Sequence, residues 1–352
     1  MRYIRFLKSP RVVTEKGTQR DQIFCLITIT SDLGESFLPY DVQLSAELLS
    51  SEPREVVLVW RTVQWTAGMR SLPITFPFTK SRASSKYRIR VGVEPRSRHD
   101  TFDNFCDEGS CGIVSAWSSH FAPSANALEK QNLVERRFKL GDSQALSMFE
   151  ETGESIARHL WDAGVTLSFQ IKRLLQKETS LVSLQNGRPQ VLELGTGCGM
   201  VGIVIAKTVP GANVLLTDLA EAEEIVQKNI KQAELAKGAT ATFQELDWDE
   251  ELPPVLRLKS SVLDLIVAAD CTYNSDSSPA LVNTFRRLAQ ASPKVRVAIA
   301  MKMRHSSEEV FFSLMTEAGF QEVTKLDFPL PGDVEAGEEV VHLHVYQYHL
   351  RT

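Results

Sequence analysis

The chain has 352 residues, of which 43% are hydrophobic and 24% are charged, and its formal net charge at pH 7 is -5. These fractions exclude a disordered or low-complexity chain, and the length predicts two domains. The sequence holds no dense basic stripe, so a purely electrostatic grip on nucleic acid is not expected. The negative charge instead favours a basic partner, such as a lysine-rich protein surface.

Cysteine usage and the N-terminus bear on the compartment. The five cysteines, Cys25, Cys106, Cys111, Cys198 and Cys271, are odd in number and match no zinc template. We expect free thiols, typical of a reducing compartment, with a Cys106–Cys111 disulfide as the alternative. The N-terminus lacks the apolar core of a secretory signal, and no stretch of about 18 apolar residues predicts a membrane span. We therefore expect a soluble cytoplasmic protein without a membrane partner, with the nucleus as a second location.

Short apolar runs dominate the chain from Arg2 to about Pro123. They are rich in β-branched and aromatic residues, and strands without helical patterns between them indicate an all-β sandwich or barrel. We assign residues 1–123 to a β-rich domain that selects the substrate, and residues 124–150 to a linker and the first strands of the next domain. The predicted strands are Gln22–Thr30, Val56–Val63, Leu72–Phe76 and Tyr87–Val93.

The pattern changes in the second half, which we assign to a domain of residues 151–352. Apolar residues at three- and four-residue spacing predict a helix over Glu154–Gln176 that carries Trp161, with Thr152 as its N-cap. Further helices are predicted at Met200–Thr208, Glu221–Ala236, Pro279–Ala291 and Ser306–Ala318. Strands are predicted at Val191–Leu194, Asn213–Thr217, Thr240–Leu246, Val262–Ala268, Lys294–Met301, Phe320–Phe328 and Val340–Tyr348.

This alternation of strands and helices predicts the fold class. Strands that alternate with helices form a largely parallel sheet with helices on both faces. Only a turn-rich segment separates the last two strands, so they are expected to pair as an antiparallel hairpin. The sequence therefore predicts an α/β fold with a seven-strand doubly wound sheet, preceded by the smaller β-rich domain.

A glycine-rich loop follows the first strand of this sheet. Gly195, Gly197 and Gly199 alternate with Thr196 and Cys198 just before a helix. Glycines allow a tight turn and close approach of a ligand to the main chain, and a helix N-terminus presents free N–H groups. With Gly202 the loop also matches the dinucleotide fingerprint G-x-G-x-x-G. The glycines alone therefore do not choose between a nicotinamide cofactor and S-adenosylmethionine.

Acids near three strand ends bear on this choice, and the second of them, Asp218, fits either cofactor. Glu193 lies inside the strand before the loop, where its carboxylate can bind the methionine ammonium but would repel a pyrophosphate. Asp218 ends the second strand and can accept hydrogen bonds from ribose hydroxyls. Asp247 follows the third strand and can bind the adenine amine, with Trp248 stacking beside it. The alternatives are a solvated strand end for Glu193, a helix N-cap for Asp218 and core packing for Trp248.

Three blocks of sequence, Thr152–Leu167, Glu193–Gly199 and Ala268–Tyr273, resemble the seven-strand S-adenosylmethionine methyltransferases with a Rossmann-like sheet, specifically the lysine methyltransferase-like family 16. The resemblance spans about Phe138–Leu350, and longer fungal members are similar in carrying an N-terminal extension. It implies S-adenosylmethionine as the cofactor, with Trp161 closing over it. The predicted cofactor-binding residues are Trp161, Glu193, Gly195, Thr196, Gly197, Gly199, Asp218, Asp247, Trp248 and Ala269.

Asp270 and Tyr273 match the Asp-x-x-Tyr motif that occupies the substrate position in the resembling family. A carboxylate can orient an ammonium and help its proton leave, and a tyrosine ring attracts a cation. The resemblance therefore implies catalysis by Asp270 and Tyr273 on a lysine of a protein, with a translation elongation factor as the first expected partner and a chaperone as the second. The alternative is that Asp270 caps a turn and Tyr273 packs locally.

Other functions stay open at this point. A methyltransferase acting on a small molecule or a nucleic-acid base, a nicotinamide-dependent oxidoreductase and a non-catalytic binding scaffold are the alternatives. The prolines of the Asn/Asp-Pro-Pro-Tyr motif of base and glutamine methyltransferases are missing after Asp270. His342 and His344 share one strand face, but no third ligand is evident, so no metal is expected. We expect a monomer.

Overall fold

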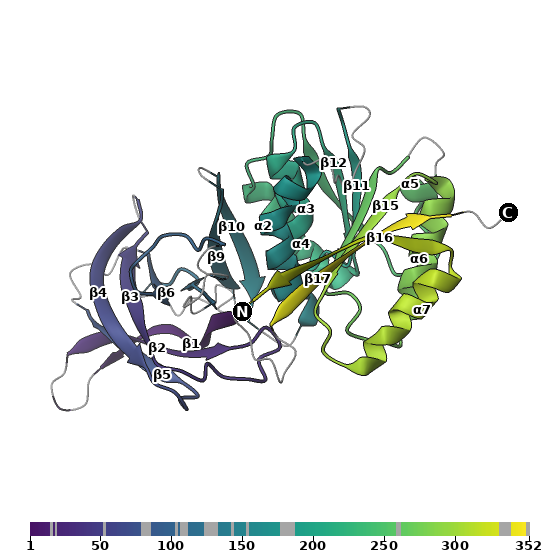
Figure 1. The fold of residues 1–352 in the computed structure, drawn as a ribbon. Coiled ribbons are helices and arrows are strands. Elements are labelled where there is room, and N and C mark those ends of the chain that lie inside the picture. The colour runs from purple at the N-terminus through teal and green to yellow at the C-terminus, as the bar shows by residue number, and fades with distance from the viewer. Residues whose placement is uncertain are drawn as a thin grey trace. The chain divides into compact units, whose positions relative to one another are not determined.

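The computed structural model describes residues 1–14, 17, 20–51, 54–78, 86–102, 105, 112–122, 133–141, 144–152, 155–176, 187–257, 262–330 and 339–349. These residues form two compact units, Met1–Ser155 and Ile156–Thr352. The first unit consists of strands, and the second alternates strands with helices (Figure 1). Among the described residues, no helix has the length and the apolar character that a membrane span needs.

Two sheets form the N-terminal unit. A four-stranded sheet has the order β5-β2-β1-β7, and a six-stranded sheet has the order β10-β9-β8-β6-β3-β4. Apolar residues from both sheets, such as Ile27 and Ile89, share one buried core, which is the arrangement of a sandwich. The strands are β1 (Arg2–Thr14), β2 (Asp21–Thr30), β3 (Val42–Ser50), β4 (Val56–Trp65), β5 (Leu72–Pro77), β6 (Tyr87–Val93), β7 (Ile113–Val114), β8 (Ala116–Trp117), β9 (Leu133–Leu140) and β10 (Gln144–Glu151).

The predicted strands of this unit are present, but two long strands were missed. β2, β4, β5 and β6 begin within one residue of the predicted positions. β1 contains Pro10 and several charged residues, and its pairing with β2 shifts register between Phe6 and Lys8 and again between Lys8 and Arg11. Such bulges admit a proline into a strand, and they also hide the period-2 pattern. β3 was missed because Ala46, Glu47 and leucines are not typical of strands.

The strands at residues 133–151 belong to the N-terminal unit. β9 pairs with β8 and β10 pairs with β9, so both extend the six-stranded sheet. The sequence assigned residues 124–150 to a linker and first strands, whereas the compact units divide between Ser155 and Ile156. Most of the expected linker, and the pair Cys106 and Cys111, lie outside the described residues.

The C-terminal unit has the predicted seven-stranded sheet, in the order β13-β12-β11-β14-β15-β17-β16. The first five strands of this order are parallel, and β16 and β17 form the expected antiparallel hairpin. The α/β prediction with a preceding smaller β-rich domain is therefore confirmed. The strands are β11 (Gln190–Leu194), β12 (Asn213–Asp218), β13 (Thr240–Glu245), β14 (Leu265–Ala269), β15 (Arg296–Met301), β16 (Phe320–Pro329) and β17 (Val340–Tyr348).

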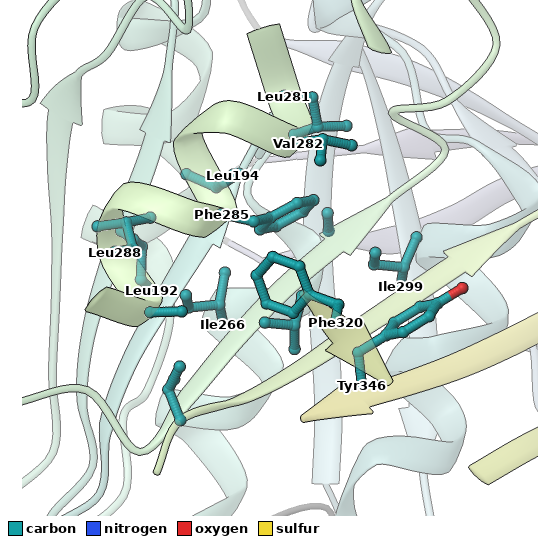
Figure 2. Close-up of a cluster of buried hydrophobic side chains, with 14 of the residues drawn as sticks. Leu192, Leu194, Ile266, Leu281, Val282, Phe285, Leu288, Ile299, Phe320 and Tyr346 are labelled. Atoms are coloured by element: carbon teal, nitrogen blue, oxygen red, sulfur yellow. The ribbon is translucent and has the colours of Figure 1, made fainter. Parts of the chain in front are cut away.

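Helices cover both faces of this sheet (Figure 1). On one face Phe285 of α6 packs edge-on against Phe320 of β16, with ring centroids 6.5 Å apart, above Ile266 of β14 (Figure 2). The strands between the two helical layers are almost continuously apolar, as is typical of buried parallel strands. The helices are α2 (Asp162–Gln176), α3 (Met200–Thr208), α4 (Glu223–Gln232), α5 (Pro254–Arg257), α6 (Ser278–Ala291) and α7 (Val310–Glu317).

The first helix of this unit begins later than the sequence predicted. The predicted helix Glu154–Gln176 is a short 3-10 helix η2 (Ile156–Arg158), followed by α2 from Asp162. The Trp161 carbonyl accepts the Val165 N–H at 3.0 Å, which makes Trp161 the residue before the helix. Placing Trp161 on the helix and choosing Thr152 as its N-cap were therefore wrong. Contacts with distant residues, described below, determine where α2 begins.

Candidate functional site

Four parallel strands end at one edge of the seven-stranded sheet. β11 ends at Leu194, β12 at Asp218, β13 at Glu245 and β14 at Ala269, and these strands are neighbours in the order β13-β12-β11-β14. In open parallel sheets, ligands bind outside this carboxyl edge. The segments that the sequence assigned to a cofactor and to an acceptor follow these four strands, so the fold brings them to one place.

The loop after β11 requires glycine for conformation and for space. Gly195, Gly197 and Gly199 have φ values of 62°, 55° and 83°, in the left-handed region that glycine adopts without strain. A Cβ on Gly195 would lie 2.5 Å from the Cys271 Sγ. A Cβ on Gly197 would lie 3.2 Å from the Ala157 carbonyl oxygen. A side chain at any of these positions would be strained by the positive φ, and at Gly195 it would also overlap the Cys271 sulfur.

Gly199 and Gly202 serve helix packing. Gly199 is the N-cap of α3, and a Cβ there would lie 3.1 Å from Leu216 Cδ2 and 3.2 Å from Ile203 Cδ1. A Cβ on Gly202 would lie 2.6 Å from Glu193 Oε2. These glycines let α3 lie close to β11 and β12, and neither lines the cavity described below. The dinucleotide-like spacing of the glycines is thus partly a packing requirement.

Glu193 braces the glycine loop from the strand beneath it. Its Oε2 accepts hydrogen bonds from Thr196 Oγ1 at 2.6 Å and from the Gly202 N–H at 2.8 Å. Burial raises the pKa of this carboxyl to about 7, although both hydrogen bonds act to lower it. With only 2% of its surface exposed, Glu193 is not a solvated strand end.

Asp218 holds the same loop from the neighbouring strand. Its Oδ2 accepts the Gly197 N–H at 2.8 Å, and its Oδ1 accepts the Leu219 N–H at 2.8 Å. Burial raises the pKa of this carboxyl as well. The following 3-10 helix η3 (Ala220–Ala222) has Leu219 as its N-cap and no side-chain cap, so Asp218 is not a helix cap. A carboxylate has about four acceptor sites, so Asp218 keeps capacity for a ligand hydroxyl.

Asp247 and Trp248 lie at different depths. Asp247 is exposed, and its Oδ1 accepts the Asp249 N–H at 3.0 Å within a turn. The Trp248 indole is partly buried against the core and reaches the glycine loop, since its Cζ2 lies 3.3 Å from the position of a Cβ on Gly195. Trp248 therefore packs against the core and also lies beside the glycine loop.

A cavity opens between the glycine loop and the start of α2. The space within it, which includes a part open to solvent, is about 360 Å³. Six of the predicted cofactor residues line it: Trp161, Glu193, Gly195, Thr196, Gly197 and Ala269. Gly199, Asp218, Asp247 and Trp248 do not line it. The lining residues that the sequence did not single out are His159, Leu160, Gly164, Val165, Cys198, Met200 and Val201.

These missed residues flank predicted ones in the sequence. Leu160 and Gly164 are four residues apart and follow the helical spacing around Trp161, while Met200 and Val201 open the helix after the glycine loop. Sequence spacing was therefore a usable signal for their position beside the site, although it does not show which of them face a cavity.

Asp270 follows β14 in an unusual backbone conformation. With φ of 53°, it is the only described non-glycine residue at positive φ, which an aspartate tolerates better than most residues. Its Oδ2 accepts the Ala163 N–H at 2.8 Å, and its Oδ1 accepts a hydrogen bond from Arg304 Nη1 at 3.0 Å. Both oxygens are thus engaged by the protein itself, and 6% of the residue is exposed. This arrangement therefore does not favour the predicted direct contact between the Asp270 carboxylate and a lysine ammonium.

Tyr273 is the accessible member of the Asp-x-x-Tyr motif. Half of its surface is exposed, which distinguishes it from the buried Asp270. Partial burial raises the pKa of its phenol, with smaller contributions from the negative charges of Asp218 and Glu221. Tyr273 therefore keeps its proton near neutral pH and offers a ring and a hydroxyl, not a base.

His342 and His344 on β17 each pair with a carboxylate of β16. His342 Nδ1 lies 2.7 Å from Asp327 Oδ1, and His344 Nδ1 lies close to Glu322 Oε1. No group of three or more potential metal ligands occurs within the described part of the chain. These contacts account for both imidazoles as cross-strand pairs of the terminal hairpin.

Comparisons with known proteins identify the family of the chain. A family model described as lysine methyltransferase matches residues 140–318. The UPF0665 family protein C23C4.06c of Schizosaccharomyces pombe is 30% identical over 317 residues, covering 88% of this chain and 91% of that protein. Protein N-lysine methyltransferase METTL21A of Danio rerio is 31% identical, covering 53% of this chain and 79% of its own. EEF1A lysine methyltransferase 3 of Mus musculus is 29% identical, covering 49% and 68%.

Proposed function

The chain belongs to the lysine methyltransferase family, as its sequence blocks predicted, and from that premise we propose that it transfers a methyl group from S-adenosylmethionine to a lysine of another protein. When bound, the cofactor supplies an electrophilic methyl group on a sulfonium centre. One observation carries the proposal: the glycine loop and Glu193 line a cavity, and Asp218 and the Asp270–Tyr273 segment lie at the ends of strands that reach the same sheet edge.

The residues around the cavity fit a positively charged nucleoside. Glu193 is buried and Asp218 is partly buried, this burial raises the pKa of both carboxyls, and no described lysine or arginine acts on either. Buried carboxylates without a cation partner are favourable neighbours for a ligand cation. We assign the methionine end of the cofactor to Glu193 and the glycine loop, and the ribose hydroxyls to Asp218. Trp161 supplies an aromatic wall.

On the acceptor side we assign different roles to the two motif residues. Tyr273 is exposed, so its ring can contact the lysine side chain and attract its cationic form. Asp270 is engaged by Ala163 and Arg304, so we assign it to positioning rather than to direct contact with the amine. The amine must lose a proton before it accepts a methyl group, and the protonated Tyr273 phenol is not the base.

A translation elongation factor is the first substrate we propose, and a chaperone is the second. The mouse relative carries EEF1A in its printed name, which supports a translation factor. The net charge of -5 favours association with a basic protein surface.

Transfer of a labelled methyl group to fractionated lysate, followed by peptide mapping, tests this function. We expect label on a lysine of one protein fraction, and none with the Gly197→Val variant as a matched control. Label on a nucleic acid or a small molecule would contradict the lysine assignment. Stabilisation of the chain by NAD but not by S-adenosylhomocysteine would contradict the cofactor assignment.

We propose that the N-terminal unit selects the substrate protein, since it has a core of its own. A deletion that ended at the predicted domain boundary, after Ala122, would divide the six-stranded sheet between β8 and β9. The deletion to test is therefore residues 1–155, which is the whole N-terminal unit. We expect this deletion to lower labelling of the substrate protein much more than affinity for S-adenosylhomocysteine. Equal losses of both would show that the unit is needed for folding instead.

A further inference from the structure

Three consecutive residues at the start of α2 are held by side chains from the loops after β14 and β15. Each residue is held through a different kind of group: an aromatic ring, a carboxylate and a main-chain N–H. The contacts are Trp161 with Arg304, Asp162 with Lys302, and Ala163 with Asp270. We call these three contacts the α2 clasp.

Two of the contacts are buried polar interactions. Lys302 Nζ lies 2.8 Å from Asp162 Oδ2, and the side chains are 1% and 0% exposed. Asp270 Oδ2 accepts the Ala163 N–H at 2.8 Å, where α2 has no intrahelical acceptor for it. A carboxylate is also favoured at this end of a helix by the macrodipole. The clasp therefore explains why α2 begins at Asp162 and not at the predicted residue 154.

Arg304 joins two parts of the clasp. Its Nη1 lies 3.0 Å from Asp270 Oδ1, and its Cζ lies 5.8 Å from the centroid of the Trp161 ring. The loop that carries Arg304 is itself fixed, because Glu308 Oε1 accepts the N–H groups of Arg304 and His305, both at 3.0 Å. The guanidinium thus lies on a segment held by two hydrogen bonds, and it contacts both a carboxylate and an indole.

The clasp acts on residues that form the cavity. Trp161 lines the cavity, as do Leu160 before it and Gly164 and Val165 after it. The Trp161 Nε1 donates to the Ile156 carbonyl at 3.2 Å, so the ring is held on its edge as well as on its face. A shift of the indole would therefore change the wall of the cavity.

We propose that Arg304 is a positioning residue for cofactor binding, which rests on the function proposed above. Its guanidinium holds the Asp270 carboxylate and the Trp161 indole in one arrangement, and this arrangement places the indole against the cofactor. Arg304 acts through Trp161, and it does not itself line the cavity.

Calorimetric titration of the full chain with S-adenosylhomocysteine tests the role of Arg304. We expect Arg304→Gln to raise the Kd about fivefold to tenfold, because an indole that Arg304 no longer holds must be ordered when the cofactor binds. Arg304→Lys keeps a charge for Asp270 but has no flat face for the indole, so its Kd should lie in between. Arg296→Gln is the matched control, because Arg296 begins β15 at the opposite sheet edge and bonds Gln347.

A double-mutant cycle separates positioning from general destabilisation. If Arg304 acts through Trp161, adding Arg304→Gln to Trp161→Ala should change the Kd little beyond the effect of Trp161→Ala alone. Independent effects of the two changes would instead multiply, and that result would overturn the proposal. An unchanged Kd in a folded Arg304→Gln variant would also overturn it.

The outcomes distinguish this inference from the proposed function. A wild-type chain that does not bind S-adenosylhomocysteine would reject the function, and the inference with it. A wild-type chain that binds while Arg304→Gln binds equally well would reject the inference alone. If circular dichroism shows that Arg304→Gln does not fold, Arg304→Lys decides, and an unchanged Kd in that variant rejects the inference.

Discussion

Three buried glutamates of the N-terminal unit and two acids beside the glycine loop of the C-terminal unit differ in their partners. In the N-terminal unit the buried glutamates Glu47, Glu135 and Glu150 each pair with an arginine, and the Glu150 pair is fully buried on both sides. In the C-terminal unit the buried Glu193 and the partly buried Asp218 lie beside the glycine loop, and no described cation acts on either. The arginines neutralise these three glutamates, as Lys302 and Arg304 neutralise Asp162 and Asp270, whereas Glu193 and Asp218 have no such partner beside the glycine loop.

The pKa values express this difference. Burial acts to raise the pKa of Glu135, but hydrogen bonds and positive charge from Arg137, with the charge of Arg88, lower it to about 2. Burial raises the pKa of Glu193 to about 7, because only a hydroxyl and an N–H oppose it. Burial thus disfavours the ionised form of both acids, and only Glu135 has arginines that offset this effect. The acids without such a partner lie where a cationic ligand is proposed to bind.

The largest effect should come from breaking the glycine loop. Gly197→Val should lower affinity for S-adenosylhomocysteine by at least about 100-fold, since a branched side chain at positive φ would displace the loop. Calorimetry measures this. Gly238→Val is the control: Gly238 has φ of 72°, but a Cβ there would meet nothing closer than 3.9 Å. The control should lose stability and keep its affinity, and loss of affinity in both variants would contradict the assignment of the loop.

A second change tests the paired acids of the N-terminal unit. Arg136→Met leaves the buried Glu150 carboxylate without its cation and should lower the free energy of unfolding by about 3–5 kcal/mol. Urea denaturation followed by circular dichroism measures it. The double variant Arg136→Met/Glu150→Leu should recover most of the loss, because no charge is then left buried. A loss below about 1 kcal/mol for Arg136→Met would show that the pair is not needed.

The pH dependence of stability tests the unpaired acid. The folded pKa of Glu193, about 7, exceeds its ordinary value of 4.5, so the folded state binds the proton more tightly. The wild type should therefore lose about 3 kcal/mol from this group as pH rises from about 4.5 to 7. Glu193→Gln has no carboxyl group to ionise at this position, so its melting temperature relative to wild type should rise between about pH 4.5 and 7. A difference that does not change with pH would contradict the raised pKa.

Glu135 should show the opposite sign. Its folded pKa of about 2 lies below its ordinary value of 4.5, so its contribution to stability is present above pH 4.5 and disappears as pH falls toward 2. Glu135→Gln should thus be less stable than wild type at neutral pH, and the two should converge in acid. Equal stability of wild type and Glu135→Gln at neutral pH would contradict the lowered pKa of Glu135.

The smallest effect concerns the acceptor side. Tyr273→Ala should lower turnover about tenfold through loss of the cation-attracting ring, while Tyr273→Phe should lower it about twofold. Affinity for S-adenosylhomocysteine should not change in either variant. Tyr40 in the N-terminal unit is also partly exposed, and Tyr40→Ala should leave turnover unchanged. Equal turnover in wild type and Tyr273→Ala would remove Tyr273 from the acceptor side.

The bounds of a helix or strand were predicted correctly where neighbouring residues in the sequence indicate them. β6, β17 and α3 were predicted with their observed bounds, because each is a short apolar run or a helical repeat between clear breaks. β1 was missed because its register shifts around Pro10 interrupt the alternation. The start of α2 was misplaced because the apolar spacing continues upstream of Asp162, while the helix itself is held by groups far along the chain.

Residues of the candidate site were likewise predicted where they lie within a short sequence motif. Glu193, Thr196 and Gly197 were found because they lie within one short motif, and all three line the cavity. Arg304 and Lys302 were missed, although they follow β15 just as Asp270 follows β14. Segments after parallel strands meet at one edge, so that position was an available signal.

The sequence by itself determined the alternation of strands and helices, the glycine loop and the acids around it, because these are patterns within a few residues of one another. Only the tertiary structure decided that Asp270 binds the Ala163 N–H and Arg304, residues 107 and 34 positions away. A carboxylate can cap a turn, orient an amine or pair with a guanidinium, and its residue type fits all three. Which of these it does depends on which donors the folded chain places within hydrogen-bonding distance.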